Sequence, residues 1–246
     1  MIFAAVTDIH GNHLALEAVL EDIRRLGIDA IVNLGDCFSG PLEAGKTAEI
    51  LLGLDLPTVR GNHDRYLVEQ PVEAMGPSDA HAFRQLDDRS RDWIRALPFD
   101  MVWRDEVYLC HATPQDDSTY WLETVTPEGY VVPRPATEIE AWAAGVAQPL
   151  MLCGHTHLPR TVRLSDGHLV VNPGSVGCPA YTDDRPYPHK VEARSVHACY
   201  AICEKRGGAW AVTFRQVPYD HMAMAELAAA NGRPDWASAL ATGFIR

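Results

Sequence analysis

The sequence predicts an α/β protein in which helices cover a largely parallel sheet. Two observations indicate this class: over the first sixty residues short apolar runs alternate with amphipathic stretches, and glycines with polar side chains follow the apolar runs. A βαβαβ order requires parallel strands that are joined by crossover helices. With 246 residues and 47% hydrophobic side chains, the chain is long enough for a sizeable core and too apolar for disorder.

The first sixty residues are expected to form three short strands and two helices. Ile2–Val6 is an apolar run typical of a buried strand. Asn12 is expected to cap the next helix, and Gly27 stands just past the end of that helix. The other elements in this part of the chain are a strand at 30–34, a helix around 44–52 and a strand at 58–59.

The middle of the chain contains a segment of different composition. Residues 65–100 are expected to be mostly helical, and strands are predicted at 107–110 and 150–153. Between these strands, residues 114–149 are rich in proline, threonine and aromatics, and residues 116–148 hold six acids against one arginine. Such a segment is predicted to be an insertion or cap over the site.

After residue 157 the pattern changes to hairpins. Ser-Asp-Gly-His separates the predicted strands 161–164 and 169–171, and Lys-Arg-Gly-Gly separates 195–203 and 209–217. An alanine-rich helical tail begins at about residue 220, with a weaker stretch at its end. The sequence has no internal repeats, so we expect one domain over residues 1–246.

Charge and cysteine usage limit the partners and the compartment. The 21 basic and 33 acidic side chains give a net charge of −12, which disfavours nucleic acid and a polybasic membrane surface. None of the six cysteines forms a CxxC pair, which favours buried thiols in a reducing compartment. We find no apolar run long enough for a membrane span and no signal peptide. We therefore expect a cytoplasmic protein and leave its oligomeric state open.

Five clusters of metal-type ligands stand at or just past the carboxyl ends of predicted strands. They are Asp8-Ile9-His10, Gly35-Asp36, Gly61-Asn62-His63-Asp64, His111 and Gly154-His155-Thr156-His157. In open α/β sheets ligands gather at this edge, so the five clusters are expected to converge. The three glycines permit tight turns or a close approach of the backbone.

The spacing within two clusters predicts a shared cation site. Side chains at i and i+2 of an extended segment point to the same side, so Asp8 and His10 are expected to face one cation, as are His155 and His157. Donors of the His, Asp and Asn types without cysteine favour manganese, iron, zinc or a similar divalent metal. This number of ligands suits two ions about 3.5–4 Å apart with a shared carboxylate.

The motifs in this order resemble those of the calcineurin-like metallophosphoesterases, and in particular the small bacterial and archaeal phosphodiesterase branch. The matching text is DIHGN, GD, VRGNHD, the single His111, CGHTH and VNPGSVG, and it covers residues 1 to about 217. The resemblance implies two mixed β-sheets packed as a sandwich with helices on both outer faces, a four-layer α/β/β/α fold. It also implies a dinuclear metal centre.

The resemblance also implies a role for each matching residue. One metal would be held by Asp8, His10, Asp36 and His157, and the other by Asp36, Asn62, His111 and His155. His63 would lie beside the scissile oxygen as general acid or transition-state contact, and Asp64 would orient its ring. We expect manganese at both positions, with iron, zinc, nickel or magnesium as alternatives.

The implied activity is hydrolysis of small phosphate mono- or diesters by attack of a hydroxide that bridges the two metals. Two divalent ions add +4 against only two ligand carboxylates, so an anionic ester is attracted locally in spite of the net charge of −12. The alternatives are a non-catalytic metal-binding scaffold of the same fold, and a phosphatase acting on phosphoproteins or dinucleoside polyphosphates. Some members of the branch replace His63 with cysteine; this chain keeps it, which favours a hydrolase.

Several further residues each allow two interpretations. We expect His13 to face solvent, with substrate contact as the alternative. Arg60 and Arg65 either contact phosphate or form local salt bridges. The loop 181–190, with Arg185, His189 and Lys190, is expected to be a surface excursion, with a pocket wall as the alternative. The remaining candidates are Tyr120, Trp121 and Tyr130 (hydrophobic cluster or nucleobase stacking), Asn172 and Ser175 (turn formation) and Cys37 (no ligand role).

Overall fold

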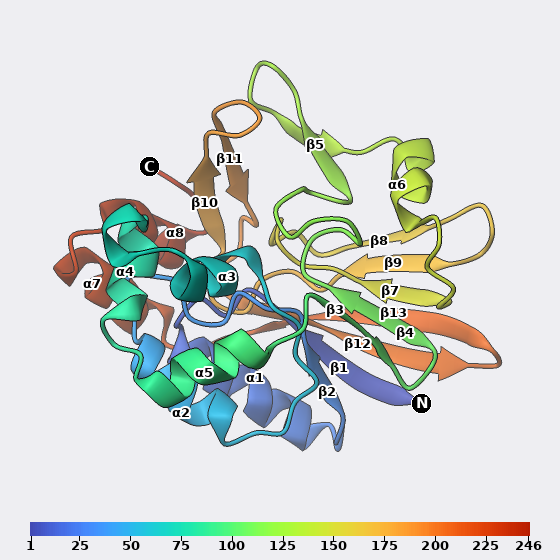
Figure 1. Ribbon diagram of the computed structural model, residues 1–246, viewed down its shortest axis with the longest axis horizontal. Helices are drawn as coiled ribbons and strands as arrows, with labels where there is room; N and C mark the ends of the chain where they lie inside the picture. Colours follow the sequence, from blue (N-terminus) through green and yellow to red (C-terminus); the bar gives the residue numbers. More distant parts are fainter.

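The computed structural model describes residues 1–246 and confirms the predicted α/β sandwich (Figure 1). The first sheet has the strand order β13-β12-β1-β2. In it β1 (Ile2–Val6) is parallel to β2 (Ile31–Asn33) and antiparallel to β12 (Ala198–Arg206), and β13 (Ala209–Val217) forms the far edge. The sheet is therefore mixed, and its parallel pair comes from the first βαβ unit.

The second sheet has five strands in the order β3-β4-β7-β9-β8. The inner strands β4 (Val107–Cys110), β7 (Leu150–Leu152) and β9 (Leu169–Asn172) run parallel to one another. The edge strands β3 (Asp100–Trp103) and β8 (Arg160–Arg163) pair antiparallel with β4 and β9. The carboxyl end of β4 thus leads into His111, and that of β7 leads into the segment that carries His155 and His157.

The alternation of side chains along β1 explains how the layers pack. Phe3 and Ala5 point between the sheets, where they join Leu109, Leu152 and other buried apolar side chains of the second sheet. Ala4 and Val6 point to the opposite face and pack against the helices of the first outer layer. Burying both faces of β1 requires the nearly continuous apolar run seen in the sequence.

The helices α1 (His13–Arg25), α2 (Ala44–Leu52) and α5 (Asp88–Ala96) supply apolar side chains to the core on the outer face of the first sheet. As predicted, Asn12 caps α1, because its side chain accepts a hydrogen bond from the amide of Ala15. The second outer face is covered by a single helix, α6 (Ala136–Ala143). Figure 1 shows these layers from α1 and α2 through the two sheets to α6.

The segment between β2 and β3 is mostly helical, as expected, and carries α3 (Asn62–Glu69), the short 3₁₀ turn η1 (Val72–Ala74), α4 (Pro77–Phe83) and α5. The third strand predicted at 58–59 is reduced to a single parallel bridge between Asn33 and Thr58. The parallel part of the first sheet therefore contains two strands instead of the three that the sequence predicts.

Two segments differ from the sequence prediction. The loop 181–190 is not a simple surface excursion, because it belongs to a hairpin of β10 (Ala180–Asp183) and β11 (His189–Glu192). The tail after α7 (His221–Ala230) is a second helix, α8 (Pro234–Thr242), which packs on α7 and β10. In the insertion, β5 (Glu123–Val125) and β6 (Val131–Pro133) form a further small hairpin ahead of α6. No helix of the chain is long and apolar enough to pass through a membrane.

Candidate metal centre

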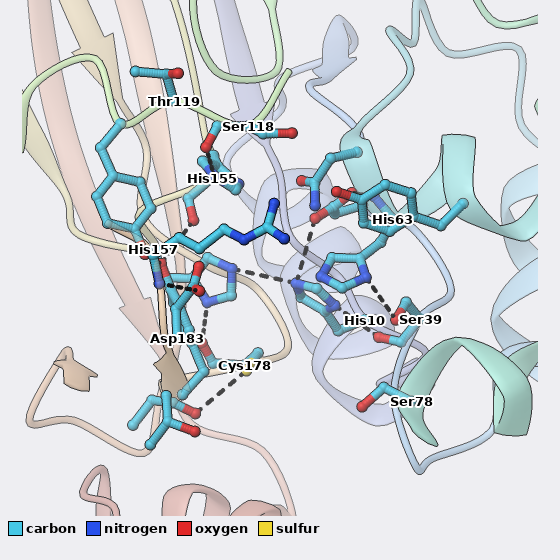
Figure 2. A pocket seen from close by; sticks show the side chains of 18 of the residues that line it. His10, Ser39, His63, Ser78, Ser118, Thr119, His155, His157, Cys178 and Asp183 are labelled. Atoms are coloured by element: carbon cyan, nitrogen blue, oxygen red, sulfur yellow. Dashed lines mark hydrogen bonds and ion pairs between the residues drawn. The ribbon is translucent and has the colours of Figure 1, made fainter. Parts of the chain in front are cut away.

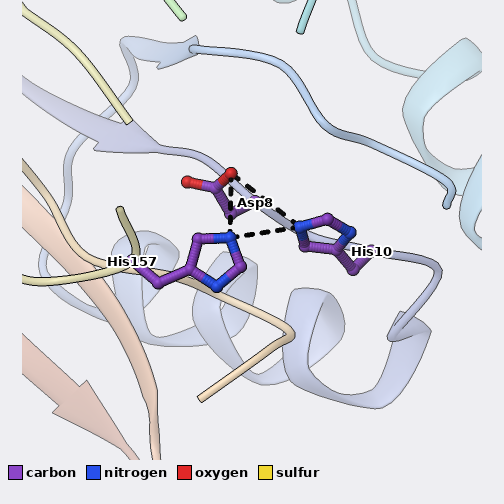
Figure 3. A group of neighbouring side chains, drawn as sticks. All are labelled: Asp8, His10 and His157. Carbon is purple, nitrogen blue, oxygen red and sulfur yellow. Dashed lines mark hydrogen bonds and ion pairs between the residues drawn. The ribbon is translucent and has the colours of Figure 1, made fainter. Parts of the chain in front are cut away.

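Three of the predicted ligands, Asp8, His10 and His157, form the first buried group (Figure 3). Asp8 and His10 follow β1, and His157 follows β7. The Nε2 atom of His157 lies 3.2 Å from Asp8 Oδ1 and 3.2 Å from the Nε2 atom of His10. Three potential ligand atoms from two distant segments therefore surround one point.

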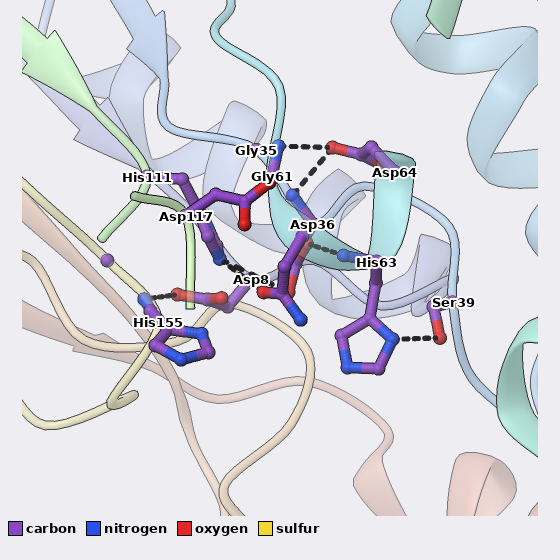
Figure 4. A network of polar contacts seen from close by, with 12 residues as sticks. Asp8, Gly35, Asp36, Ser39, Gly61, His63, Asp64, His111, Asp117 and His155 are labelled. Carbon is purple, nitrogen blue, oxygen red and sulfur yellow. Dashed lines mark hydrogen bonds and ion pairs between the residues drawn. The ribbon is translucent and has the colours of Figure 1, made fainter. Parts of the chain in front are cut away.

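Asp36, His111 and His155 form a second group, and Asn62 lies beside it. The Nε2 atom of His111 is 3.3 Å from Asp36 Oδ2 and 3.1 Å from the Oδ1 atom of Asn62. Asp36 Oδ2 is also 3.9 Å from His10 Nε2, which belongs to the first group. Figure 4 shows Asp36 among residues of both groups, the position that a shared carboxylate requires.

The four histidines are oriented by backbone carbonyls. One ring nitrogen of each lies 2.7–2.9 Å from a carbonyl oxygen, and the second nitrogen is left for the centre. Metal-binding histidines are held in the same way, because the bonded N–H fixes both the tautomer and the ring orientation. The pairs are His10 Nδ1 with Ser39, His111 Nδ1 with Leu34, His155 Nε2 with Ser118, and His157 Nδ1 with Cys178.

Two further observations indicate that the group of Asp8, His10 and His157 suits a bound cation. Asp8 Oδ1 is buried and faces the Nε2 atom of His157, which lies 3.2 Å away and outside hydrogen-bond geometry, and such a position is costly for an ionised oxygen. Burial lowers the pKa of His157, but the carboxylate of Asp8 outweighs it and raises that pKa well above its ordinary value. The site thus favours positive charge at the point where the three side chains meet. A metal ion would displace the proton and satisfy the same atoms.

Five of the seven predicted ligands have a left-handed backbone, which non-glycine residues rarely adopt. The φ angles are 54° for Asp8, 51° for His10, 54° for Asp36, 69° for His155 and 60° for His157. The extended geometry that we assumed for Asp8 and His10 is therefore wrong. It is also wrong for His155 and His157, which point into different groups. Left-handed residues of this kind concentrate at functional sites, where the surrounding structure holds them in place.

Glycine is required where the loops that carry Asp36 and Asn62 touch. A Cβ atom on Gly61 would lie 2.1 Å from Asp36 Oδ1, and one on Gly35 would lie 2.4 Å from the Gly61 nitrogen. Gly35 also has a φ of +95°. Both contacts agree with the close backbone approach that the sequence predicts.

The structure corrects the role expected for Asp64. Its carboxylate accepts hydrogen bonds from the backbone amides of Asp36 (2.8 Å), Cys37 (3.0 Å) and Gly61 (3.1 Å), and the hydrogen-bond partners of the His63 ring are other residues. A carboxylate at this place satisfies three buried N–H groups and thereby fixes the Asp36 loop against α3. Asp64 is consequently a residue that shapes the site and not a partner of His63.

His63 is oriented instead by Asp79 of α4 and by Ser39. The His63 Nδ1 atom lies 2.8 Å from Asp79 Oδ1 and 3.3 Å from Ser39 Oγ. Burial lowers the pKa of His63, but the carboxylates of Asp36 and Asp79 outweigh it and raise that pKa to about 9. The two carboxylates therefore favour the protonated ring, which is the form that is able to donate a proton.

Both groups reach one cavity of about 1200 Å³, which is lined by His10, His157, Asp36, His155 and His63 (Figure 2). Its walls come from α3, from the insertion, from the β10–β11 hairpin and from α8. Residues of the 181–190 segment and of the insertion thus both line the cavity. A cavity of this size accommodates far more of a substrate than one phosphate group.

Comparison with known proteins identifies the family. The model of the calcineurin-like phosphoesterase superfamily domain matches residues 1–189. The chain belongs to this superfamily. Protein MJ0912 of Methanocaldococcus jannaschii, an uncharacterized relative, is 25% identical over 201 residues, which cover 72% of this chain and 77% of that protein.

Solved structures with the same fold agree with the superfamily assignment. The crystal structure of a metallophosphoesterase from Sphaerobacter thermophilus aligns with a TM-score of 0.76 over 99% of both chains, at 24% identity. That of a putative diadenosine tetraphosphatase aligns with a TM-score of 0.54 over 87% of this chain and 93% of that one, at 18% identity. These likenesses show a metallophosphoesterase fold. The individual ligand roles stay predictions.

Within this phosphoesterase fold, the secondary candidates separate into structural and pocket-lining residues. Arg65 forms a two-pronged salt bridge with Asp117, at 2.6 and 2.8 Å, and also lines the cavity. Arg60 lies 3.3 Å from a carboxylate oxygen of Glu69 and does not line the cavity. His13 is buried, contrary to the solvent-facing position that we expected.

The aromatic and turn residues are also resolved by their contacts. Trp121 is buried in the hydrophobic cluster under the insertion, whereas Tyr120 lines the cavity and Tyr130 is 68% exposed. Asn172 donates to the Gly154 carbonyl at 2.7 Å, and Ser175 donates to the Asp8 carbonyl at 2.8 Å. The turn that holds these two residues therefore braces both ligand-bearing loops.

Sequence reasoning missed three side chains beside the site. Asp79 and Ser39 contact His63, and the Trp236 ring of α8 lies 5.9 Å from the His10 ring, centroid to centroid. Asp79 and Trp236 lie far from any motif, and only their tertiary position reveals them. Ser39 stands three residues after Asp36 of the GD motif. This closeness in sequence was the only feature that could have indicated that Ser39 lies near the site.

Proposed function

We propose that this protein is a dimetal phosphoesterase that hydrolyses phosphate mono- or diesters. The observation that supports it best is the pair of buried ligand groups joined by Asp36 at the floor of a cavity that also contains His63. Family membership supports phosphoric ester chemistry in general. The two-metal arrangement and the hydrolytic step are our inference from the geometry.

The residues divide the chemical work. When bound, two divalent ions supply positive charge that polarises the phosphate ester and makes an attacking water more acidic. His10, His111, His155 and His157 would hold the ions together with Asp8, Asp36 and Asn62. His63, kept protonated by its carboxylate neighbours, would donate a proton to the leaving oxygen as the ester bond breaks. A water molecule is the nucleophile, so no covalent enzyme intermediate is required.

The expected substrate is a small phosphate ester rather than a nucleic acid. The net charge of −12 disfavours a long polyanion, which needs many Lys and Arg contacts to its phosphates. The same charge does not oppose a small ester at a dimetal site, because the ions exceed the charge of the two ligand carboxylates. The six cysteines are all free and buried, which supports a reducing, cytoplasmic location.

A screen of metals against substrates tests the proposal. Protein freed of metal and reloaded with Mn²⁺, Fe²⁺, Zn²⁺, Ni²⁺ or Mg²⁺ is assayed with 4-nitrophenyl phosphate and with bis(4-nitrophenyl) phosphate. We expect the highest activity with manganese and two equivalents of metal per chain by elemental analysis. Asp36→Asn is expected to lower both the activity and the metal content. Wild-type protein that holds two metals but cleaves neither ester class would favour the scaffold alternative instead.

A further inference from the structure

One face of α3 forms a continuous wall of the cavity. His63 and Tyr66 lie three residues apart on this helix, and Gln70 follows four residues later, directly after its last turn. All three line the cavity. Residues at i, i+3 and i+7 share one helix face, and seven residues span about 10 Å at 1.5 Å each. The wall therefore runs from the candidate proton donor outward.

Tyr66 is the ring that stands next to His63 in this wall. The two ring centroids are 5.5 Å apart and the ring planes cross at 82°. The Arg65 guanidinium lies 4.7 Å from the Tyr66 centroid and is itself held by the two bonds to Asp117. A fixed guanidinium and a phenol ring thus form a preorganised aromatic platform beside the point at which the leaving group departs.

Gln70 completes the wall with a free amide. Its backbone N–H bonds to the Tyr66 carbonyl, whereas its side-chain amide has no hydrogen-bond partner in the protein. An amide offers both a donor and an acceptor, so it pairs with a polar ring edge. The order along α3 is therefore proton donor, aromatic ring and amide.

We propose that His63, Tyr66 and Gln70 form a leaving-group subsite for a flat, conjugated ring with hydrogen-bonding atoms on its far edge. This inference rests on the proposed function for the place of the leaving oxygen, because that oxygen must lie beside His63. The ring then packs against Tyr66, and its polar edge reaches Gln70. Tyr66 and Gln70 determine specificity without taking part in the bond change.

Binding of phosphonates, which cannot be hydrolysed, tests the subsite without relying on activity. Titration calorimetry compares phenylphosphonate with methylphosphonate on the Mn²⁺-loaded protein. The Tyr66→Leu substitution is expected to weaken the binding of phenylphosphonate about two- to thirteenfold more than that of methylphosphonate, the range for one aromatic pair. Tyr66→Phe keeps the ring and should retain the wild-type ratio. Tyr130→Leu, at an exposed tyrosine outside the cavity, is the matched control and should change neither constant.

A second arm tests Gln70. Gln70→Ala is expected to weaken the binding of 4-carbamoylphenylphosphonate about two- to thirteenfold more than that of phenylphosphonate, the range for one hydrogen bond. Equal weakening of both phosphonates by Tyr66→Leu, or a wild-type protein that binds them equally, overturns the subsite. If the Tyr66→Leu variant does not fold, the ratio of the wild-type affinities for the two phosphonates still tests the subsite. Wild-type protein that prefers phenylphosphonate but cleaves no ester supports the subsite and contradicts the proposed function, so the two failures are distinguishable.

Discussion

The contact between His63 and Asp79 leads to the sharpest prediction about catalysis. Asp79 lies on α4, outside every motif, and its carboxylate is 2.8 Å from His63 Nδ1 in a nearly buried position. We expect Asp79→Asn to lower kcat while the affinity for substrate changes little. The amide still accepts a hydrogen bond from the ring, but it no longer supplies the negative charge that keeps the ring protonated.

The size of the effect follows from the two kinds of hydrogen bond. A bond to a charged group contributes about 1.5–3 kcal/mol, against about 0.5–1.5 kcal/mol for a neutral one. The difference of about 1–1.5 kcal/mol corresponds to a loss of about five- to thirteenfold in kcat. Asp79→Ala removes the bond entirely, so its loss should reach about 10- to 150-fold by the same arithmetic.

The assay is steady-state hydrolysis of the best ester from the metal screen, with metal content and melting temperature measured for each variant. Asp88→Asn on α5 is the matched control, because the Asp88 side chain is 95% exposed and should leave kcat unchanged. The reasoning is refuted if Asp79→Asn binds metal normally and retains the wild-type kcat. It is also refuted if the loss appears entirely in KM.

Three further predictions concern stability. Asp64→Asn should lower the free energy of unfolding by about 2–4 kcal/mol in urea unfolding. The reason is that the amide NH₂ would face a backbone N–H donor whose hydrogen bond the carboxylate accepts in the wild type. A decrease of less than about 1 kcal/mol in the free energy of unfolding would contradict this role. Removal of metal by a chelator should lower the melting temperature, because a metal ion at a free concentration of 100 times its Kd adds about 2.7 kcal/mol to the free energy of unfolding. An unchanged melting temperature would argue against both metal sites. Hydrogen bonds from Arg215 outweigh burial and lower the pKa of Asp22 in the folded protein. The pair therefore stabilises the fold fully above the unfolded pKa of Asp22, about 3.9. This stabilisation is lost as the pH falls through the lower pKa of the folded state. The stability gap between wild type and Asp22→Asn should therefore be widest near neutral pH and close in acid, and a gap that widens in acid would disprove the assignment.

The sequence was sufficient for elements whose signal is local or periodic. The apolar run Ile2–Val6, the Asn12 cap and the glycines at 35 and 61 each follow from rules that act over a few residues. The β10–β11 hairpin was missed because its strands are four residues long and its loop is rich in proline. Helix α8 was missed because it packs mainly against α7, and a pairing of two helices is not encoded in any local sequence pattern.

The candidate ligands could be predicted as a set, but the extended i, i+2 geometry from which we argued their convergence was wrong. Asp8 and His10 face one point because both adopt left-handed backbone, and extended geometry would have sent His155 and His157 to the same metal. Left-handed conformations of Asp and His leave no periodic trace in a sequence. The motif order carried information that the spacing alone did not.

The strained ligands also explain why the motifs contain residues that touch neither metal nor substrate. A left-handed residue other than glycine costs about 1–2 kcal/mol, so the surrounding contacts must compensate at each of the five positions. Asp64 binds the amides on both sides of the Asp36 peptide unit, Ser175 binds the Asp8 carbonyl, and Asn172 binds the Gly154 carbonyl just before His155. The last residue of GNHD and the polar residues of VNPGSVG therefore hold strained ligand loops. Their chemical role is indirect, because the donor atoms converge only while these bonds are made.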